Sequence, residues 1–163
     1  MGLLDRSYDF DIYLSSQLIF KYMKKTEMHA GVDFLLKMAK ANAVITRKLD
    51  ARLGGIGFTE FMLMHYVSKS EGGRARRTDL ADQLGLTASG ITRVLLPMEK
   101  IGLVKREADK NDARVSYVTL GHGGKEKLVE GLERADIFCE ENLAKINSKK
   151  LAETSSVLSA LVS

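Results

Sequence analysis

The chain has no tryptophan, one proline and one cysteine among its 163 residues. A single cysteine cannot form a disulfide within the chain, so a small secreted fold held together by disulfides is excluded. No apolar run approaches the roughly 20 residues that span a bilayer, and the first residues lack the apolar segment of a signal peptide. We therefore expect a cytoplasmic protein that does not contact a membrane.

Motifs for metal binding and catalysis are also missing from the sequence. The three histidines, His29, His65 and His122, do not follow the spacing of a metal site, and no cysteine pair supports zinc. Gly-x-Ser-x-Gly is absent, and no histidine lies near Cys139 in the sequence. We expect no catalytic residue, no metal and no cofactor. Because Cys139 falls on an apolar helical face, we interpret it as a packed residue rather than a redox sensor.

The composition that remains is that of a folded globular protein. Hydrophobic residues make up 45% of the chain and charged residues 28%, and the length is that of one domain. The net charge is +4, and residues 74–114 contribute +3 of it through nine basic and six acidic side chains. Because the chain is only mildly cationic, the position of this positive charge matters more than its size.

Apolar spacing predicts a mainly α chain with one small β-hairpin. After Gly102, alternation over residues 103–107 and 115–120 on either side of a polar turn predicts the hairpin. A glycine cluster at residues 54–57 is interpreted as a turn, because no strand precedes it and no Lys-Ser or Lys-Thr follows. Pro97 predicts a kink near residues 93–96. Helices are expected over residues 9–25, 31–53, 59–68 (capped by Thr59), 78–84, 88–101, 128–146 and 149–161.

The helix near the C-terminus has a nearly heptad apolar seam. Its members are Leu128, Leu132, Ala135, Cys139, Leu143 and Ile146. The helix over residues 31–53 offers a second apolar stripe. Both stripes are expected to meet a second copy of the chain, since symmetric dimers are the commonest soluble assemblies. The alternative is that the two stripes pack against each other within one monomer.

A helix-turn-helix pattern lies between residues 79 and 94. Ala81 supplies a small residue where two helices cross, Gly85 tolerates positive φ in the turn, and Ile91 anchors the second helix. Any helical hairpin can imitate this spacing. The basic hairpin that follows directly makes the pattern specific.

These segments resemble the MarR family of winged helix-turn-helix regulators. The resemblance rests on residues 77–86, 91–93, 95–104 and 109–114, the last of which reads Asp-Lys-Asn-Asp-Ala-Arg. It implies a winged helix-turn-helix flanked by dimerisation helices. The expected division is N-terminal dimerisation helices over 1–57, the DNA-binding part over 58–121, and C-terminal dimerisation helices over 122–163. Where the family follows the wing with Leu-Thr, this chain has Leu120-Gly121.

In a helix-turn-helix, the second helix lies in the major groove of DNA with its first residues at the base edges. Small residues there let the backbone approach closely, and Arg93 can pair with a guanine through two hydrogen bonds. The alternative is an ordinary exposed helix start capped by Thr87. The resemblance implies that Asp112 anchors the wing and sends Arg114 into the minor groove. The expected DNA contacts are Arg77, Thr87, Ala88, Ser89, Thr92, Arg93, Lys105, Arg106, Lys110, Asn111, Asp112 and Arg114.

Aromatic residues gather near the N-terminus and imply one of two roles. Tyr8, Phe10, Tyr13, Phe20 and Tyr22 either pack on the dimer seam or line a pocket for an aromatic effector. The resemblance implies small phenolic or lipophilic ligands bound between the dimer helices and the winged part. Met62, His65 and Tyr66 are weak candidates for that pocket.

The sequence therefore predicts a homodimeric regulator that binds double-stranded DNA at a pseudo-palindromic operator. A repressor released by a small phenolic or lipophilic ligand is the favoured form. The alternative is a winged-helix protein-interaction module in which Arg93 and Arg114 contact an acidic partner protein.

Overall fold

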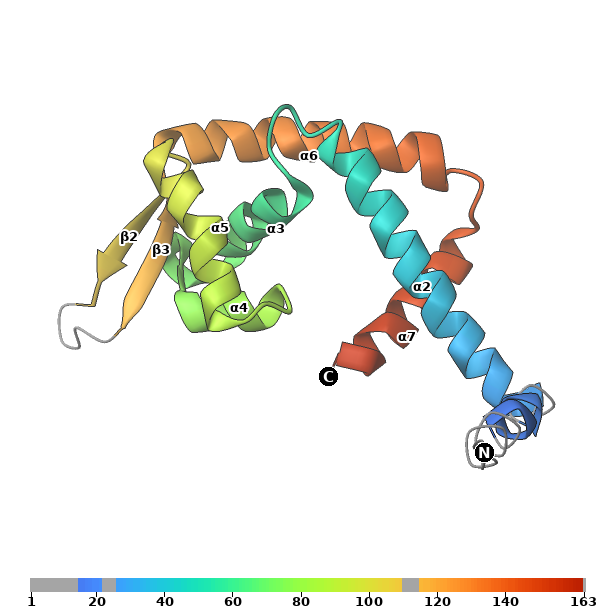
Figure 1. Cartoon of the computed structure of the whole chain (residues 1–163). Coiled ribbons are helices and arrows are strands. Elements are labelled where there is room, and N and C mark those ends of the chain that lie inside the picture. The colour runs from blue at the N-terminus through green and yellow to red at the C-terminus, as the bar shows by residue number, and fades with distance from the viewer. Residues whose placement is uncertain (1–14, 22–25, 110–114, 163) are drawn as a thin grey trace, which may run out of the picture. The chain divides into compact units, whose positions relative to one another are not determined.

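A computed structural model of the chain describes residues 15–21, 26–109 and 115–162. The fold is mostly helical with a small β-hairpin, as expected, and a third strand extends the hairpin to a three-stranded antiparallel sheet (Figure 1). Residues 1–45 and residues 46–163 form two separate compact units. Residues 15–21 are helical. The further elements are α2 (Thr26–Asp50), α3 (Phe58–Lys69), the 3-10 turn η1 (Glu71–Gly73), β1 (Arg74–Arg76), α4 (Arg77–Gln83), α5 (Ala88–Lys100), β2 (Val104–Ala108), β3 (Ser116–Leu120), α6 (His122–Leu143) and α7 (Ser148–Val162).

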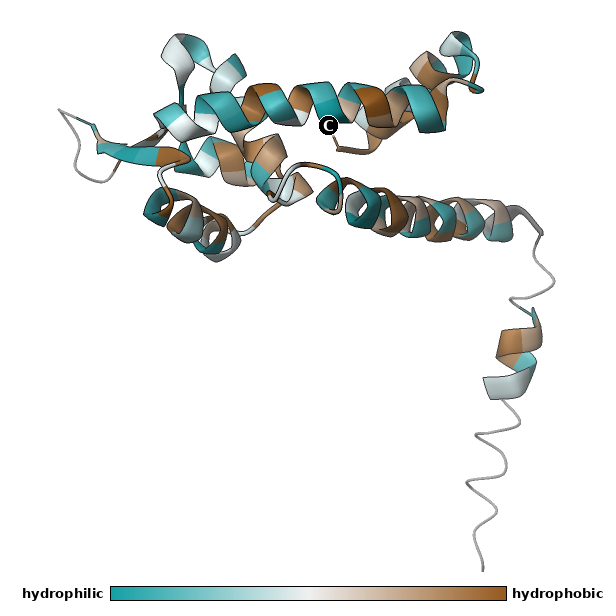
Figure 2. Cartoon of the chain, turned by 90° about the horizontal axis from the view of Figure 1, so that it is seen from above, coloured by the Kyte–Doolittle hydropathy of each residue, from teal (hydrophilic) through white to brown (hydrophobic). Residues whose placement is uncertain are grey.

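None of the described helices is long and apolar enough to span a membrane. Figure 2 shows polar and apolar residues alternating along α6 and α2, so neither helix is apolar over its whole length. Helices with this mixture bury one stripe and leave the other faces to solvent or to a partner.

The helix expected over residues 31–53 is displaced toward the N-terminus. It begins at Thr26 and ends at Asp50, and Leu53 is fully buried beyond its end. Gly54 and Gly55 adopt positive φ angles of 70° and 89°, which ends the helix and confirms the turn. Of the helix expected over residues 9–25, residues 15–21 are helical, and the others lie outside the described residues.

The start of α3 corrects the predicted cap. Thr59 lies inside the helix, and the N-cap is Gly57. The Glu60 side chain accepts a hydrogen bond from the Gly57 backbone N–H at 2.6 Å, and Asp50 accepts one from Phe58 N at 2.6 Å. Carboxylates therefore satisfy the free N–H groups at this helix start, and one of them comes from the end of α2.

The core of the unit formed by residues 46–163 lies where α3, α5 and the sheet meet. Ile91, Leu95 and Met98 of α5 are fully buried, together with Leu63 and Met64 of α3. One apolar face of α5 is therefore buried in the core, and its other face is exposed. Pro97, at which a kink is expected, lies inside α5, and α5 continues as one helix through that residue.

Glycines bring α6 against the rest of the unit. Gly123 and Gly124 lie within α6, which begins directly after β3 with Gly121 as its N-cap. A Cβ on Gly124 would lie 1.9 Å from the Leu103 carbonyl oxygen. One on Gly131 would lie 2.7 Å from the Phe61 ring. The buried face of α6 is therefore built partly from residues that have no side chain.

This arrangement changes the meaning of the predicted seam. The buried residues of α6 are Gly124, Leu128, Gly131 and Phe138. Of the predicted seam residues, Leu128 alone is buried, whereas Leu132, Cys139 and Ile146 are exposed. Cys139 is not packed within this unit, and its packing on the seam stays a prediction that requires a second copy of the chain. The predicted seam was built from large apolar residues alone. It therefore missed the face of α6 on which glycines allow close approach to the core.

Hydrogen bonds and ion pairs join α6 to the turn after α2 through Lys127, Glu130 and Arg134, which we call the polar clasp. Lys127 Nζ donates to the Gly54 carbonyl oxygen at 2.7 Å and forms an ion pair with Glu130 at 2.6 Å. Arg134 forms an ion pair with Glu130 at 2.8 Å and donates to the Arg52 carbonyl oxygen at 3.2 Å. The hydrogen bond from Lys127 is the main cause that lowers the pKa of Glu130 below its usual 4.5, and Arg134 adds to it.

We expect the clasp to lose its effect in acid. A folded-state pKa below the unfolded value means that Glu130 contributes stability above pH 4.5 and loses this contribution as the pH falls through its folded pKa. Glu130→Gln should melt at a lower temperature than the wild type near neutral pH, and the difference should disappear below the folded pKa. Glu133→Gln, at an exposed position on the same helix, is the control for thermal melts over this range. A difference that persists unchanged in strong acid would contradict the assignment.

Candidate nucleic-acid interface

The two helices of the helix-turn-helix meet as the residue spacing predicts. Ala81 is buried where α4 and α5 cross, and Ile91 is fully buried on the inner face of α5. Gly85 has a φ of 62°, and Leu86 N donates to the Ala81 carbonyl oxygen at 2.8 Å to close the turn. A side chain at Gly85 would be strained, so the tight turn depends on glycine.

The first turn of α5 is exposed and rigidly capped. Thr87 Oγ1 accepts a hydrogen bond from Gly90 N at 3.0 Å, and it lies 3.1 Å from Ser89 Oγ. Thr87, Ala88 and Ser89 are all exposed. The predicted cap is confirmed, and a fixed helix start with small side chains lets the backbone approach another molecule closely.

Farther along α5, two expected DNA contacts divide into different roles. The hydroxyl of Thr92 donates to the Ala88 carbonyl oxygen at 2.9 Å and accepts from Arg77 Nη1 at 3.3 Å. Thr92 and Arg77 are both half-buried, so their polar groups serve to join α4 to α5. Arg93 is exposed and has no hydrogen bond or ion pair within the described part of the chain. Its guanidinium is therefore free for an external acceptor.

The wing is an antiparallel hairpin of β2 and β3, close to the expected bounds. Val104 pairs with Leu120 and Ala108 with Ser116, and Asp109 N donates to the Val115 carbonyl oxygen at 3.0 Å toward the tip. Lys105 is exposed on β2. The expected contacts Lys110, Asn111, Asp112 and Arg114 lie outside the described residues.

Arg106 is held within the protein. Its Nε donates to Glu99 Oε1 at 2.6 Å, and its Nη2 donates to the other carboxylate oxygen, so that the pair is bidentate. The hydrogen bond to Glu99 raises the pKa of Arg106. Because Glu99 offsets this charge, Arg106 has less attraction for a phosphate than its neighbour Lys105.

Comparison with known proteins identifies the fold and its family. Residues 59–116 match the model of the MarR family. The winged helix-turn-helix part of the chain is similar to the MarR family. The matched segment runs from α3 to the start of β3 and thus contains the helix-turn-helix and most of the wing. MarR-family proteins are transcriptional regulators and not enzymes, in agreement with the sequence analysis.

Three similar proteins illustrate the relationship. The HTH-type transcriptional regulator YdgJ of Bacillus subtilis is 24% identical over 72% of this chain and 70% of its own. Sco3205, a MarR-family regulator from Streptomyces coelicolor solved in complex with DNA, has a TM-score of 0.71 and 20% identity over 78% of this chain and 82% of its own. The organohalide-sensing regulator RdhR, solved with 2,4-dichlorophenol bound, has a TM-score of 0.69 and 18% identity over 78% of this chain and 76% of its own.

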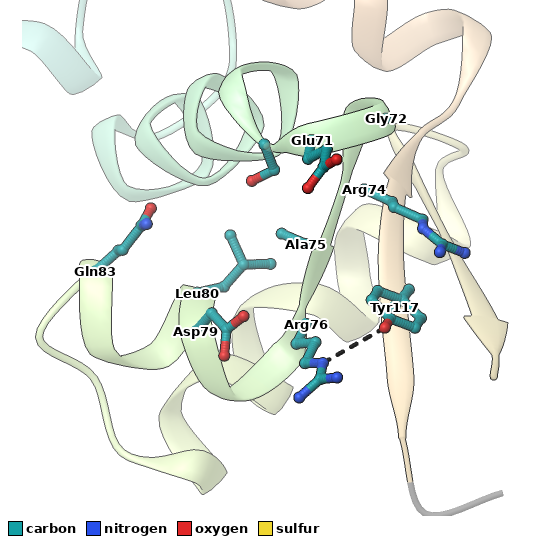
Figure 3. A pocket seen from close by; sticks show the side chains of 10 residues that line it. Glu71, Gly72, Arg74, Ala75, Arg76, Asp79, Leu80, Gln83 and Tyr117 are labelled. Carbon is teal, nitrogen blue, oxygen red and sulfur yellow. Dashed lines mark hydrogen bonds between the residues drawn. The ribbon is translucent and has the colours of Figure 1, made fainter. Parts of the chain in front are cut away.

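The sheet includes a third strand that the sequence analysis missed. β1 pairs with β3 in antiparallel register, which gives the strand order β1-β3-β2. The exposed-buried-exposed order of Arg74, Ala75 and Arg76 is the expected alternation, but three residues are too few to be recognised by pattern. A cleft of about 580 Å³ lies beside β1, with Leu80 and Gln83 of α4 among its lining residues (Figure 3).

Two of the three residues expected to bind an effector, His65 and Tyr66, belong to an aromatic cluster on α3. The His65 ring is stacked on Phe61 with centroids 6.4 Å apart and lies edge-on to Tyr66 at 6.0 Å. Met62, His65 and Tyr66 are half-buried. None of the three lines the cleft beside β1. Of the N-terminal aromatics, Phe20 is exposed, and Tyr8, Phe10, Tyr13 and Tyr22 lie outside the described residues.

Proposed function

We propose that this MarR-family regulator is a homodimeric cytoplasmic repressor that binds a pseudo-palindromic operator and is released by a small phenolic or lipophilic ligand. Arg93 carries the proposal. It is an exposed guanidinium without a hydrogen bond or ion pair to any described residue, on a helix whose capped first turn presents only small side chains. A guanidinium in this position can donate two hydrogen bonds to the O6 and N7 atoms of guanine.

The way in which α5 is held supports a role in sequence recognition. Thr92 fixes the helix to Arg77 of α4, and Ile91 anchors it in the core. A helix held on two sides presents its free face in one orientation, which is required for reading base edges. The DNA complex of Sco3205 is a precedent for a protein of this fold on DNA.

Exposed apolar residues on α6 and α7 support the dimer. Val129 and Ile137 of α6 are 57% and 54% exposed, and Leu132 is 39% exposed. Val157 and Leu161 of α7 are similarly exposed. Apolar residues clustered on helices outside the core favour burial against a partner. With a second copy as that partner, two winged-helix units would reach successive half-sites.

The proposed effector is a small aromatic molecule that binds near Met62, His65 and Tyr66. The ring cluster on α3 offers apolar surface together with a histidine and a phenol that can form hydrogen bonds. RdhR, with 2,4-dichlorophenol bound, is a precedent for a phenol ligand on this fold. A ligand that binds the DNA-free form more tightly would shift the protein away from its operator.

Selection of duplexes from a random pool tests the proposal. We expect a pseudo-palindrome with half-sites about 10 base pairs apart, centre to centre. Affinity should fall with salt along a log–log slope of roughly −5 to −9, because 6–10 phosphate contacts release about 0.9 counterions each. A slope near zero, or a protein that captures acidic proteins but no duplex, would instead support a protein-interaction module.

The same preparation tests the assembly and the effector. Sedimentation should give about twice the chain mass of 18.0 kDa, and a monomer at micromolar concentration would exclude the dimer. Phenolic compounds added to the complex should release the selected duplex. A panel of phenols and lipophilic acids that leaves DNA binding unchanged would exclude the effector part of the proposal.

A further inference from the structure

The sheet of the winged unit has two faces of different character. Residues opposite one another in antiparallel strands project to the same face. On the inner face, Val118 is fully buried and pairs with Ala75 and with Arg106. The outer face holds the residues of the alternate register positions, namely Arg74, Arg76, Lys105, Glu107, Tyr117 and Thr119.

Tyr117 organises two arginines on this outer face. The Arg74 guanidinium lies over the Tyr117 ring, with its carbon 4.4 Å from the ring centroid. Arg76 Nε donates to the Tyr117 hydroxyl at 3.4 Å, and its guanidinium carbon is 5.9 Å from the same centroid. Figure 3 shows the two arginines leaving β1 on either side of Tyr117. One aromatic ring therefore holds two positive charges close together.

Among the described residues, no carboxylate is paired with either of these charges. Neither Arg74 nor Arg76 forms an ion pair with a carboxylate of the part of the chain that the structure describes. The carboxylate on the same face, Glu107, accepts a hydrogen bond from Thr119 at 3.2 Å. On the inner face, by contrast, Arg106 is paired with Glu99. The hydrogen bond to Tyr117 is the main cause that raises the pKa of Arg76, with smaller contributions from Asp79 and Asp109.

The outer face lies between two parts of the proposed DNA interface. Arg76 pairs with Tyr117, one residue from the start of β3, where the strand leaves the wing turn. The next residue along the chain, Arg77, donates to Thr92 of the recognition helix. Arg76 is thus the chain neighbour of a residue that holds α5, and Lys105 of the wing lies on the same outer face as both arginines.

We propose that this outer face binds the phosphodiester backbone of the DNA that flanks each half-site. Arg74 and Arg76 contact the phosphates, and Tyr117 is the positioning residue that holds both guanidinium groups. The inference rests on the proposed DNA-binding function. A backbone partner fits because the surface offers positive charge along a strand, with arginine hydrogen bonds in a fixed geometry. Such contacts add affinity without base preference.

The test compares two duplexes, one ending at the edges of the selected site and one extended by about one helical turn on each side. The double variant Arg74→Gln/Arg76→Gln should lose four phosphate contacts per dimer. Its salt slope on the long duplex should therefore be less steep by about 3.6, at 0.9 per contact. On the short duplex, the loss of affinity should be smaller. Base preference, measured with a half-site mutant, should stay that of the wild type.

Substitutions of Tyr117 separate positioning from charge. Tyr117→Leu keeps both arginines but removes the ring and the hydroxyl, so the slope on the long duplex should become less steep although no charge is lost. Tyr117→Phe keeps the ring beneath Arg74 and removes the hydrogen bond to Arg76, and its slope should lie between those of Tyr117→Leu and the wild type. Lys125→Gln/Lys149→Gln, at two exposed lysines of α6 and α7, is the charge-matched control and should bind like the wild type.

The outcomes distinguish this inference from the proposed function. A wild-type protein that selects no duplex refutes both. A wild type that binds its operator, with an Arg74→Gln/Arg76→Gln variant whose slope is unchanged on the long duplex, refutes the inference alone. Equal losses on the short and long duplexes would also overturn it, because they would place the arginines within the half-site. Thermal melts of all variants show whether a loss of binding reflects unfolding.

Discussion

Arg93→Ala should weaken operator binding by roughly 30-fold to 20,000-fold and remove the preference for one base pair in each half-site. A bidentate arginine–guanine contact contributes about 1–3 kcal/mol of discrimination, and a dimer makes two of them. Arg93 has no internal hydrogen bond or ion pair among the described residues, so its removal should leave the fold unchanged. Fluorescence anisotropy with the selected operator and with a duplex changed at that base pair measures both effects.

Arg93→Lys is the matched control for charge. Lysine retains the positive charge but cannot form the paired donor geometry of a guanidinium. The lysine variant should therefore keep the wild-type salt slope and lose most of the base preference. An Arg93→Ala protein that still discriminates the changed base pair would show that another side chain of α5 reads it.

Gly124→Ala is expected to be the most destabilising small substitution in the unit formed by residues 46–163. The added methyl group would lie 1.9 Å from the Leu103 carbonyl oxygen, and a backbone atom cannot move aside as a flexible side chain does. Either α6 or the turn before β2 must shift. Overpacking of this kind costs about 3 kcal/mol or occasionally more. A fall in Tm of roughly 6–12 °C should follow for a chain of this size.

The neighbouring glycine provides the control. A Cβ on Gly123 would lie 3.8 Å from the Gly102 carbonyl oxygen, which is an ordinary van der Waals distance. Gly123→Ala should therefore match or exceed the wild-type Tm, because alanine has the higher helix propensity. Equal melting temperatures for the two variants would show that α6 does not approach Leu103 as closely as described.

The sequence allowed good prediction of features that depend on local spacing. The turn at Gly85, the cap at Thr87 and the wing strands all follow from neighbouring residues, and the structure confirms them. The missed features depend on distant partners. β1 exists because it pairs with β3 more than 40 positions away, and the cap of α3 uses Asp50 of the preceding helix.

The candidate site shows the same division between near and distant contacts. Chain position alone predicts that Arg93 and Arg106 are both exposed cations beside DNA. The structure separates them, because Glu99 lies on the face of α5 that β2 covers and pairs with Arg106. The packing of β2 on α5 decides which of the two arginines forms an ion pair. No spacing rule within either element contains that information.

The strand order β1-β3-β2 has a consequence for solubility. Both outer strands expose backbone groups that another chain could use to extend the sheet, and such edges are starting points for aggregation. β1 is only three residues long and has arginines on both sides of Ala75, while β2 carries Lys105, Arg106 and Glu107 in succession. Short, charged edges are poor templates for a further strand. The two arginines that we propose to contact DNA phosphates therefore also oppose the addition of another strand at the β1 edge. Apolar replacements of Arg74 and Arg76 should promote aggregation of the protein as well as weaken DNA binding.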